Sequence, residues 1–563
     1  MNCYLRKTVS LDGPWHFHVD HYRLGERRAL WELRTETKRS GPVDWSPEDW
    51  PTITVPGDWN TQAPELLNYE GVGWYVRWFD AKPKASKRYV LRFGAVNYRA
   101  RVFLNGEELG AHEGGFTPFS FEVTGKLKKR NALVVMADST TLAEGIPTED
   151  TDWYNYGGIT RSVRLVELPK GFVSDLWVRL EEGKRGPRVV VDVKADGIAP
   201  GTEAVVRIPD LGAEAVCSLS KSGRGRARMP FTGERWSPSN PRLYRVEVQC
   251  GGDAVADEVG LRTVATDGNR ILLNGESIYL RGMSCHEEAA PGRRGLTDAD
   301  ISRLMRHARD LNVNFLRLAH YPHDEAVARA ADRAGVLLWE EVPVYWQIHF
   351  QKPKVLRLAK QQLTELVTRD RNRASVILWS MANETPEKPA RTRFIRAEAE
   401  HVRRLDPTRL ITAACFIRRR GTRITLPDPL FKWLDVVGIN EYMAWYGDLL
   451  PRELRRYTWQ KAFPKPVIVS ELGAGAAYGH HGRADQRWTE EYQEAVYREQ
   501  FAMLEQASYI RGMTPWILFD FRAPHRFNKW QRGFNRKGLL DNTRRRKKAF
   551  FFVRDYYGRK KED

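Results

Sequence analysis

The fold is decided by Val376-Ile377-Leu378-Trp379-Ser380-Met381-Ala382-Asn383-Glu384. The first four residues are apolar and two of them are β-branched, which is typical of a strand covered on both faces. A charge directly after such a strand is costly unless it is solvated, paired or used chemically. Because parallel α/β folds build their active sites at this end of the strands, we interpret Glu384 as a candidate catalytic carboxylate.

From about residue 267 onward, short apolar strands alternate with amphipathic helices. Helices are expected at Asp298–Leu311, with Thr297 as N-cap, and at Val355–Thr368. Eight strand–helix units in the roughly 300 remaining residues match a (β/α)8 TIM barrel. An open doubly wound sheet is the alternative, but no glycine-rich phosphate turn follows the first strand. The eight predicted strands are Ile278–Arg281, Asn314–Leu318, Val336–Trp339, Val376–Trp379, Leu410–Cys415, Val436–Ile439, Val467–Val469 and Thr514–Leu518.

The part of the chain before the barrel reads as two β-sandwiches. Residues 1–172 contain short alternating segments, and Asn105-Gly106 predicts a hairpin turn because both central residues of a type I′ turn need positive φ. This pattern predicts a jelly roll. Residues 173–266 carry simpler strands, typical of an immunoglobulin-like sandwich. With the barrel over residues 267–563, the expected architecture is multidomain β plus α/β.

Composition indicates a fully folded protein, with 563 residues, 42% hydrophobic and 11% aromatic content. The net charge of +19 allows two readings, an anionic partner or a solvated basic surface. The five cysteines form no C-x-x-C pair, so neither a disulfide framework nor a zinc knuckle is predicted. The first seven residues do not resemble a signal peptide, and no stretch is long and apolar enough to span a membrane. We therefore expect a cytoplasmic protein, although a trimmed leader would leave the same trace.

Polar side chains follow most of the predicted barrel strands and should converge on one face. Two of them, Glu384 and Glu471, end strands four and seven, which lie nearly across the barrel mouth. A facing pair of carboxylates suits glycoside hydrolysis, in which one group must donate a proton and the other must be ionised. Each raises the pKa of the other when charged, so one site can supply both states. The strand-end residues are His286, Glu287, His320, Glu340, Glu341, Asn383, Glu384, Asn440, Glu441, Tyr442, Ser470, Glu471, Trp516 and Asp520.

At this point the sequence resembles glycoside hydrolase family 2 over nearly its whole length. VILWSMANE resembles the acid/base motif of the family, and KPVIVSELGAG (Lys465 to Gly475) resembles its nucleophile motif. Segments of the first half resemble its jelly-roll and immunoglobulin-like domains, and others resemble the entry into its barrel. These further segments are SLDGPWHF from Ser10, VPGDWN from Val55, FLNGEELGAHEGGFTPF from Phe103, WSPSNPRLY from Trp236, LLNGESIYLRGMSCHEE from Leu272 and FLRLAHYP from Phe315.

The resemblance implies a retaining mechanism without a cofactor or metal. Glu384 would be the general acid/base and Glu471 the nucleophile that forms a covalent glycosyl-enzyme, with their carboxyl groups ~5–5.5 Å apart. Asn383 would hydrogen-bond the sugar 2-hydroxyl, and Tyr442 would donate to Glu471. His286, which follows strand one, and Trp516, which lies in strand eight, are further candidates for contact with the sugar.

The choice of sugar depends on Gly533-Phe534-Asn535-Arg536-Lys537-Gly538. In the β-glucuronidases of this family, an Asn-x-Lys after strand eight grips the sugar carboxylate, and Asn535 and Lys537 match it. An ammonium and an amide can both donate to a carboxylate, and charge-assisted hydrogen bonds are the stronger kind. Arg532 and Arg536 would add positive potential nearby, and the basic net charge would then help to attract an anionic substrate.

Other segments also resemble the glucuronidases of the family. DTDWYN (Asp150 to Asn155) resembles the loop from which an Asp, here Asp152, reaches the far hydroxyls of the sugar. Trp445 and Tyr446 fall where those enzymes place aromatic residues. Galacturonidases could carry the same carboxylate clamp, and a neutral-sugar β-galactosidase of the family is a further alternative. No long insertion follows strand three, so an open mouth that admits larger leaving groups is expected.

Three rival functions are weaker. A nucleic-acid-binding protein would rely on the basic runs 418–420 and 544–548, which are short and lack aromatic platforms. A non-catalytic carbohydrate-binding protein would lack one of the two carboxylates. A metal-dependent hydrolase would need a ligand spacing such as H-E-x-x-H, which is absent from the sequence. The expected partner is a small-molecule or oligosaccharide glycoside, with no nucleic acid and no membrane, and a homo-oligomer is left open.

Overall fold

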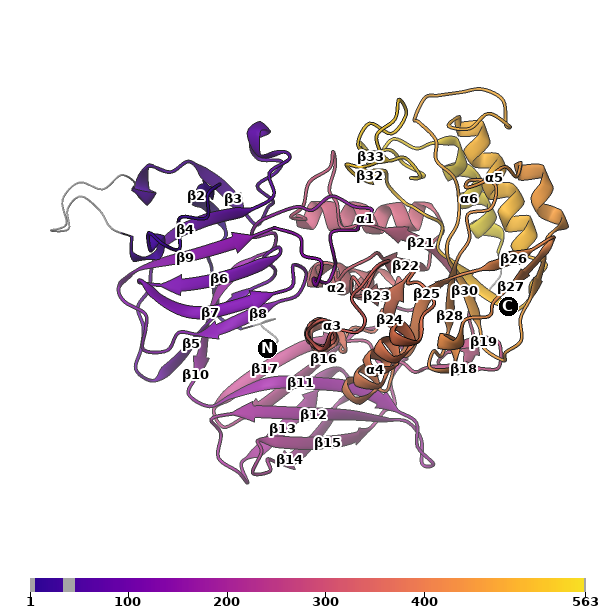
Figure 1. The fold of residues 1–563 in the computed structure, drawn as a ribbon. Helices are drawn as coiled ribbons and strands as arrows, with labels where there is room; N and C mark the ends of the chain where they lie inside the picture. The colour runs from indigo at the N-terminus through magenta and orange to yellow at the C-terminus, as the bar shows by residue number, and fades with distance from the viewer. Residues whose placement is uncertain (1–5, 34–45, 561–563) are drawn as a thin grey trace.

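The N-terminal part of the chain folds into two facing antiparallel sheets (Figure 1). The computed structural model describes residues 6–33 and 46–560. Asn105 and Gly106 have φ values of 55° and 88° in the turn between β6 and β7, which confirms the predicted hairpin. One sheet has the order β3 (Thr52–Val55), β2 (Gly13–Asp20), β4 (Val72–Asp80), β9 (Arg130–Asp138), β6 (Arg99–Leu104), β7 (Glu107–Glu113), and the other β1 (Thr8–Ser10), β10 (Val163–Pro169), β5 (Lys87–Phe93), β8 (Phe119–Glu122). The loops of this first sandwich contain three short 3₁₀ helices, η1 (Leu30–Glu32), η2 (Pro47–Asp49) and η3 (Pro64–Leu66).

A second, smaller sandwich follows, and its core is rich in valine. One sheet comprises β11 (Phe172–Glu181), β12 (Arg188–Asp196) and β15 (Arg224–Pro230); the other comprises β14 (Ala213–Ser218), β13 (Glu203–Ile208), β16 (Tyr244–Cys250) and β17 (Asp253–Val259), with η4 (Pro209–Leu211) between β13 and β14. A small sheet of β18 (Val264–Asp267), β19 (Arg270–Leu273) and β20 (Glu276–Ser277) leads into the next part of the chain. The predicted domain limits at residues 172 and 266 stay predictions. In the structure, β11 begins at Phe172 and β18 runs across residue 266.

Eight parallel strands then close into a barrel, which confirms the predicted fold class. The strands are β21 (Leu280–Cys285), β22 (Phe315–Leu318), β23 (Leu337–Glu341), β24 (Val376–Asn383), β25 (Leu410–Phe416), β28 (Val437–Asn440), β30 (Val467–Glu471) and β31 (Ile510–Met513). Helices α1 (Asp298–Asp310), α2 (Glu325–Ala334), α3 (Pro353–Asp370), α4 (Pro389–Leu405), α5 (Glu490–Leu504) and α6 (Lys548–Arg559) surround it, with η5 (Pro429–Lys432) and η6 (Pro451–Arg456). Thr297 caps α1 through a reciprocal capping box with Asp300, as its sequence predicts.

The eighth strand differs from its prediction. The sequence pattern placed it at Thr514–Leu518, whereas the strand that pairs with both β30 and β21 is Ile510–Met513. Its four residues include Arg511 and Gly512, so they form no apolar run. The apolar run at Thr514–Leu518, on which the prediction was based, follows the observed strand at the end of the barrel where the other strands also end.

Extra strands decorate the carboxyl-terminal end of the barrel. The segment after β25 forms the hairpin β26 (Arg418–Arg420) and β27 (Arg423–Thr425), which pairs with β29 (Thr458–Gln460). The segment after β31 forms the pair β32 (Phe521–Arg522) and β33 (Phe534–Asn535). Figure 1 shows β26 and β27 at the right of the barrel and β32 and β33 at its top, with the N-terminal sandwich at the left; Tyr154 of the sandwich donates to the carbonyl of Arg522 in β32 at 3.0 Å.

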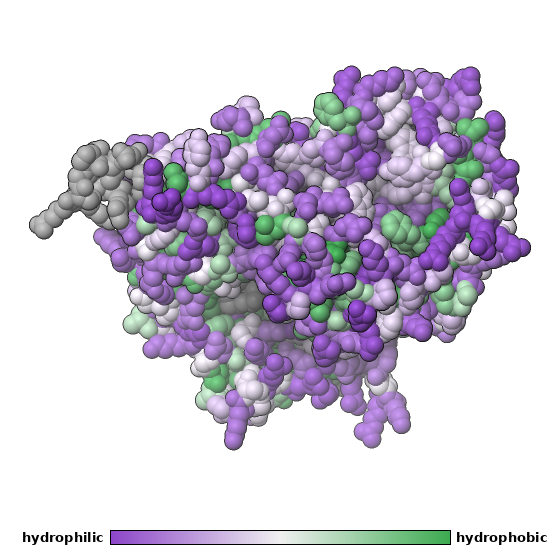
Figure 2. Space-filling model, in the orientation of Figure 1, coloured by the Kyte–Doolittle hydropathy of each residue, from purple (hydrophilic) through white to green (hydrophobic). Residues whose placement is uncertain are grey.

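The surface and the helices carry two further observations. Figure 2 shows one face that is mostly hydrophilic, with small, separated hydrophobic patches. Within residues 6–33 and 46–560, no helix is long and apolar enough to cross a membrane. Cys217, Cys250, Cys285 and Cys415 are free thiols. The fifth cysteine, Cys3, and the rest of the N-terminal residues 1–5 lie outside the described residues.

Candidate active site

A cavity of about 790 Å³ opens at the carboxyl-terminal end of the barrel strands. This volume lies within the range of small-molecule binding sites. Its wall combines strand ends, barrel loops and one loop from the N-terminal sandwich. The lining residues used below are Asp152, His320, Trp346, Glu384, Phe416, Ile417, Arg419, Asn440, Tyr442, Tyr446, Glu471, Trp516, His525, Arg526, Phe527 and Lys537.

Glu384 lies directly after β24 and turns out of the strand direction with φ of 48°. This left-handed conformation is uncommon for a residue with a side chain, and such strain is found preferentially at functional sites. Its backbone N–H donates to the carbonyl of Ala414 at 2.9 Å. Its carboxylate accepts one hydrogen bond from the indole of Trp346 at 2.9 Å and another from the amide of Asn440 at 3.0 Å. The half-buried carboxylate is therefore held in one orientation over the cavity.

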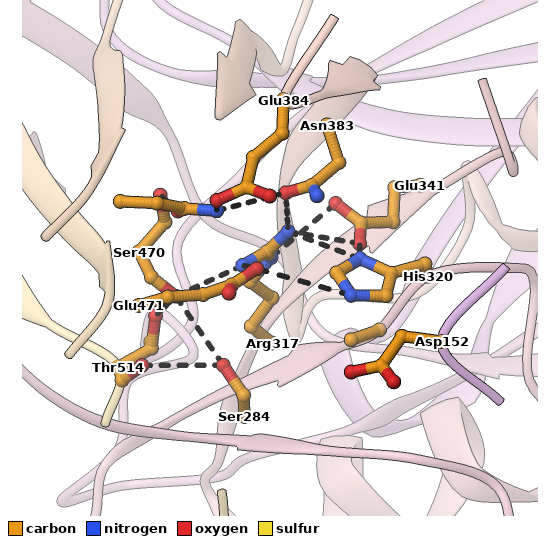
Figure 3. Close-up of polar contacts among 12 residues, drawn as sticks. Asp152, Ser284, Arg317, His320, Glu341, Asn383, Glu384, Ser470, Glu471 and Thr514 are labelled. Atoms are coloured by element: carbon orange, nitrogen blue, oxygen red, sulfur yellow. Dashed lines mark hydrogen bonds and ion pairs between the residues drawn. The ribbon is translucent and has the colours of Figure 1, made fainter. Parts of the chain in front are cut away.

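Glu471 ends β30 and faces the same space as Glu384 (Figure 3). Its Oε1 accepts a hydrogen bond from Arg317 at 2.9 Å, and its Oε2 accepts one from the Tyr442 hydroxyl at 2.7 Å. Burial raises the pKa of Glu471 to about 7; Arg317 and Tyr442 lower it, and the charge of Glu384 raises it further. Because both oxygens accept hydrogen bonds from cationic or hydroxyl donors, the contacts favour the ionised form.

Arg317, in β22, is fully buried beneath the two carboxylates and connects four side chains (Figure 3). Besides Glu471, its guanidinium donates to Glu341 at 3.2 Å and to the amide oxygen of Asn383 at 2.7 Å. His320 Nδ1 lies 2.8 Å from Glu341. Burial opposes the charge of Glu341, but Arg317 and His320 lower its pKa to about 2. Burial lowers the pKa of His320 to about 4, so at neutral pH the imidazole is neutral.

A second network joins the strands that carry the two carboxylates. The Asn440 amide donates to Glu384 and, at 3.2 Å, to Asn383. Its own oxygen accepts from the Ser470 hydroxyl at 2.7 Å, and Ser470 directly precedes Glu471. Asn383 Nδ2 is buried and has no hydrogen-bond partner in the part of the chain that the structure describes, whereas its Oδ1 accepts from both Arg317 and Asn440. An unpaired buried donor is costly, so a ligand acceptor at this position would relieve the cost.

Asp152, from the N-terminal sandwich, reaches the cavity, but its carboxylate is already heavily bonded. Arg526 donates to both of its oxygens at 2.5 Å, and Asn535 donates at 3.0 Å. Despite its burial, His525 and Arg526 lower the pKa of Asp152 to about 2. Asn535 is completely buried, and the cavity wall does not include it. The structure thus places Asn535 behind Asp152, where it orients the carboxylate.

Lys537 lies in the wall of the cavity, two residues beyond Asn535. Its ammonium donates to the hydroxyl of Tyr446 at 2.8 Å and lies 5.2 Å from the ring centre of Tyr442. Lys537 is only 2% exposed, and no carboxylate among the described residues forms an ion pair with it. Lysine is rarely this buried without an anionic partner, so the ammonium is poised to bind an anion.

The other residues expected from the sequence divide into two groups. Trp516 lines the cavity and stacks on His320 with ring centres 4.7 Å apart. The other expected residues described here do not line the cavity. His286 packs behind it against Phe521 and the Tyr321 hydroxyl, Trp445 is buried, and Arg532 is exposed and donates to the carbonyl of Lys529. Arg536 pairs with Asp520 instead of facing the mouth.

Sequence reasoning missed several residues that the structure brings to the cavity. Arg317 lies in FLRLAHYP, where an arginine inside an apolar barrel strand was the available signal; His320, in the same segment, was among the predicted strand-end residues. Trp346 and Arg526 lie on loops, whose sequences carry no periodic pattern, and Arg419 lies in the three-residue strand β26, which is too short to show one. Three further strand-end residues are engaged with protein partners: Glu287 pairs with Arg161 at 2.6 Å, while His320 and Glu341 bond each other.

Two family descriptions match the chain. "Glycosyl hydrolases family 2, TIM barrel domain" matches residues 264–561, and "Glycosyl hydrolases family 2, sugar binding domain" matches residues 8–169. The first match covers more than half of the chain.

Full-length relatives agree with these matches. The chain is 28% identical to a β-glucuronidase of Paenibacillus borealis, over 98% of this chain and 97% of that protein, and 29% identical to the β-glucuronidase of Rattus norvegicus, over 98% and 91%. Among solved structures, it is similar to a β-glucuronidase of an uncultured Clostridium sp. (TM-score 0.86, 27% identity, 100% and 99% covered). It is also similar to a β-galacturonidase of Eisenbergiella tayi bound to galacturonate (TM-score 0.84, 26% identity, 99% and 98% covered).

Proposed function

Because this chain belongs to glycosyl hydrolase family 2 and is a glycoside hydrolase, we propose that it is a retaining β-glucuronidase that removes terminal β-D-glucuronides. The observation that carries the choice of sugar is the buried ammonium of Lys537, which lines the cavity and forms no ion pair with a carboxylate of residues 6–33 or 46–560. A uronic acid supplies that partner through its own carboxylate, and such a charge-assisted hydrogen bond is strong in a buried site.

In the proposed reaction, Glu471 attacks the anomeric carbon while Glu384 gives its proton to the departing glycosidic oxygen. The bond from the anomeric carbon to the leaving oxygen breaks as the bond to Glu471 forms. Glu384, now ionised, removes a proton from water, which attacks the same carbon and releases Glu471. The contacts from Arg317 and Tyr442 support Glu471 as the anion in the first step and as the leaving group in the second.

Asn383 and Asp152 have proposed roles in holding the sugar. The unpaired Nδ2 of Asn383 donates to the 2-hydroxyl, a contact that strengthens in the transition state. Asp152, ionised and fixed by Arg526, accepts from hydroxyls at the far side of the ring. Glucuronide and galacturonide differ only in the orientation of the 4-hydroxyl, so a β-galacturonidase is the second candidate, favoured by the likeness to the galacturonate-bound structure.

A panel of nitrophenyl β-glycosides tests the proposal: glucuronide, galacturonide, galactoside, mannoside and glucoside. We expect the highest kcat/KM for the glucuronide. Lys537→Ala should weaken binding of the uronide transition state by about 2–4 kcal/mol, because a charge-assisted contact is lost, and kcat/KM for uronides should fall accordingly. Arg532→Ala removes an exposed charge on the same loop but outside the cavity and serves as the matched control. Unchanged uronide hydrolysis by Lys537→Ala would contradict the carboxylate-binding role.

A further inference from the structure

The hairpin after β25 forms the wall of the cavity beside the proton donor. Phe416, the last residue of β25, lies opposite Asn440 in the barrel register, and Asn440 donates to Glu384 at 3.0 Å. The backbone of Glu384 is also bonded to Ala414 in the same strand. In the proposed reaction, Glu384 protonates the leaving oxygen. The hairpin therefore lies on the side where the leaving group departs, whereas Lys537 and Asp152 serve the terminal sugar.

This wall presents an aromatic surface and a cation. Phe416 is 49% exposed, and Ile417 and Arg419 line the cavity next to it. Arg419 has no ion-pair partner among the described residues. On the other face of the hairpin, Arg420 lies directly opposite Arg423. Arg418 pairs with Glu387, but Arg420 and Arg423 form no ion pair with the residues that the structure describes, so part of the positive charge of the hairpin is not neutralised there.

The hairpin is an ordered platform. It pairs with β29 through Arg423 and Thr458, so loops after two neighbouring barrel strands form one small sheet. Ile424, opposite Arg419, is fully buried and anchors the hairpin in the core of the barrel. Figure 1 shows β26 and β27 extending from the rim beside β25 and β28. A fixed cation and a fixed ring are preorganised for a ligand, because binding then orders few side chains.

We propose that Phe416 and Arg419 form a subsite for an anionic sugar in the leaving group, so that the preferred substrates are acidic oligosaccharides. The ring of Phe416 supports the apolar face of that second sugar, and Arg419 pairs with its carboxylate or sulfate. This substrate class rests on the proposed function, because it assumes that Glu384 protonates the leaving oxygen. The binding contribution of Arg419 decreases as salt rises, since the side chain is exposed.

The test compares three substrates that share one terminal uronic acid: a disaccharide whose reducing sugar carries a carboxylate, one whose reducing sugar carries a sulfate, and one whose reducing sugar is neutral. We expect Arg419→Gln to lower the acidic-over-neutral ratio of kcat/KM about three- to tenfold, mainly through KM. Arg423→Gln removes the same charge from the other face of the hairpin and should leave the ratio unchanged. The two acidic substrates show whether carboxylate or sulfate is preferred.

The outcomes separate this subsite from the proposed function. If the wild type hydrolyses nitrophenyl uronides but its acidic-over-neutral ratio is near one, or responds equally to Arg419→Gln and Arg423→Gln, the subsite is overturned while the uronidase stands. If nitrophenyl uronides are not hydrolysed, the uronidase proposal fails. The disaccharide series is then built on the terminal sugar that the panel selects, and the same comparison of the two variants decides the subsite.

Discussion

Glu471 and Tyr446 line the same cavity but belong to walls of different construction. Glu471 is 5% exposed and is held by Arg317 and Tyr442, whereas Tyr446 is 54% exposed. The inner wall, made by Glu384, Glu471 and the side chains bonded to them, comes from strand ends that the barrel fixes. The outer wall is made by the rim residues Phe416, Arg419, Tyr446 and Phe527, which lie at the end of β25, in the added hairpin and on loops. Chemistry that all substrates share is thus placed on the barrel strands, and selection among substrates is left to the additions and loops at the rim.

The largest effect should come from Glu471→Gln in the inner wall. The change keeps the shape of the side chain but removes the nucleophile, so we expect kcat to fall at least about 10⁴-fold for every glycoside in the panel. Glu441→Gln is the matched control. Glu441 is 1% exposed at the same barrel end, and burial raises its pKa to about 8, so glutamine resembles its neutral form. A comparable loss in both variants would show that removing a buried carboxyl, not the nucleophile, causes the effect.

Glu384→Ala should show a loss that depends on the leaving group. A leaving group that needs protonation, such as an alkyl alcohol, should react about 10²–10⁴-fold more slowly, because general acid catalysis contributes that much. An activated nitrophenyl group needs no proton, so formation of its glycosyl-enzyme should be largely spared. Pre-steady-state rates for alkyl and nitrophenyl glycosides measure the difference. Equal losses for both would remove Glu384 from the role of proton donor.

The pH dependence of kcat/KM tests the ionisation of the inner wall. Burial raises the pKa of Glu471 to about 7, above the ordinary value for a glutamate, and only the ionised form attacks. Activity should therefore fall about tenfold per pH unit as the pH drops below about 7. Tyr442→Phe removes a hydrogen bond that lowers this pKa, so its acidic limb should move to higher pH. An acidic limb that stays in place in Tyr442→Phe would assign it to another group.

The smallest effect should come from Tyr446→Phe in the outer wall. The variant removes the acceptor that positions Lys537 but keeps the ring. We expect KM for the glucuronide to rise about two- to fivefold with little change in kcat, because one hydrogen bond to an exposed group is lost. Tyr478→Phe, an exposed tyrosine packed on Arg545 outside the cavity, is the control. A large fall in kcat in Tyr446→Phe would contradict the division between the two walls.

The same division explains how much the sequence could predict. Seven of the eight predicted barrel strands overlap the observed ones, because apolar runs report burial on both faces. Glu384 and Glu471 stand out because each charge comes at the end of a strand that begins with such a run. The eighth strand was misplaced since Arg511 and Gly512 interrupt its apolar pattern.

Residues of the loops could not be found in this way. Trp346 and Arg526 reach the cavity only because of how their loops fold, and no periodicity marks them. Asn535 and Lys537 show the limit of a short motif. The two residues are separated by a single position, yet the side chain of Lys537 lines the cavity and that of Asn535 lies behind Asp152. Spacing identifies the residues, and only the packed structure assigns each a contact.

The insertion of Asp152 and its neighbour Trp153 into the barrel mouth has a consequence for protein synthesis. Trp153 is buried against Tyr345 at a ring distance of 4.9 Å, so an early segment completes a surface made from late ones. The N-terminal sandwich leaves the ribosome first, while Ile510–Met513, which closes the barrel, and Lys537 emerge near the end. A nascent chain therefore carries Trp153 before its partner Tyr345 has been synthesised. Hydrolytic activity begins only when the loop with Asp152 and Trp153 has docked on the barrel, so it reports assembly of the N-terminal sandwich with the barrel.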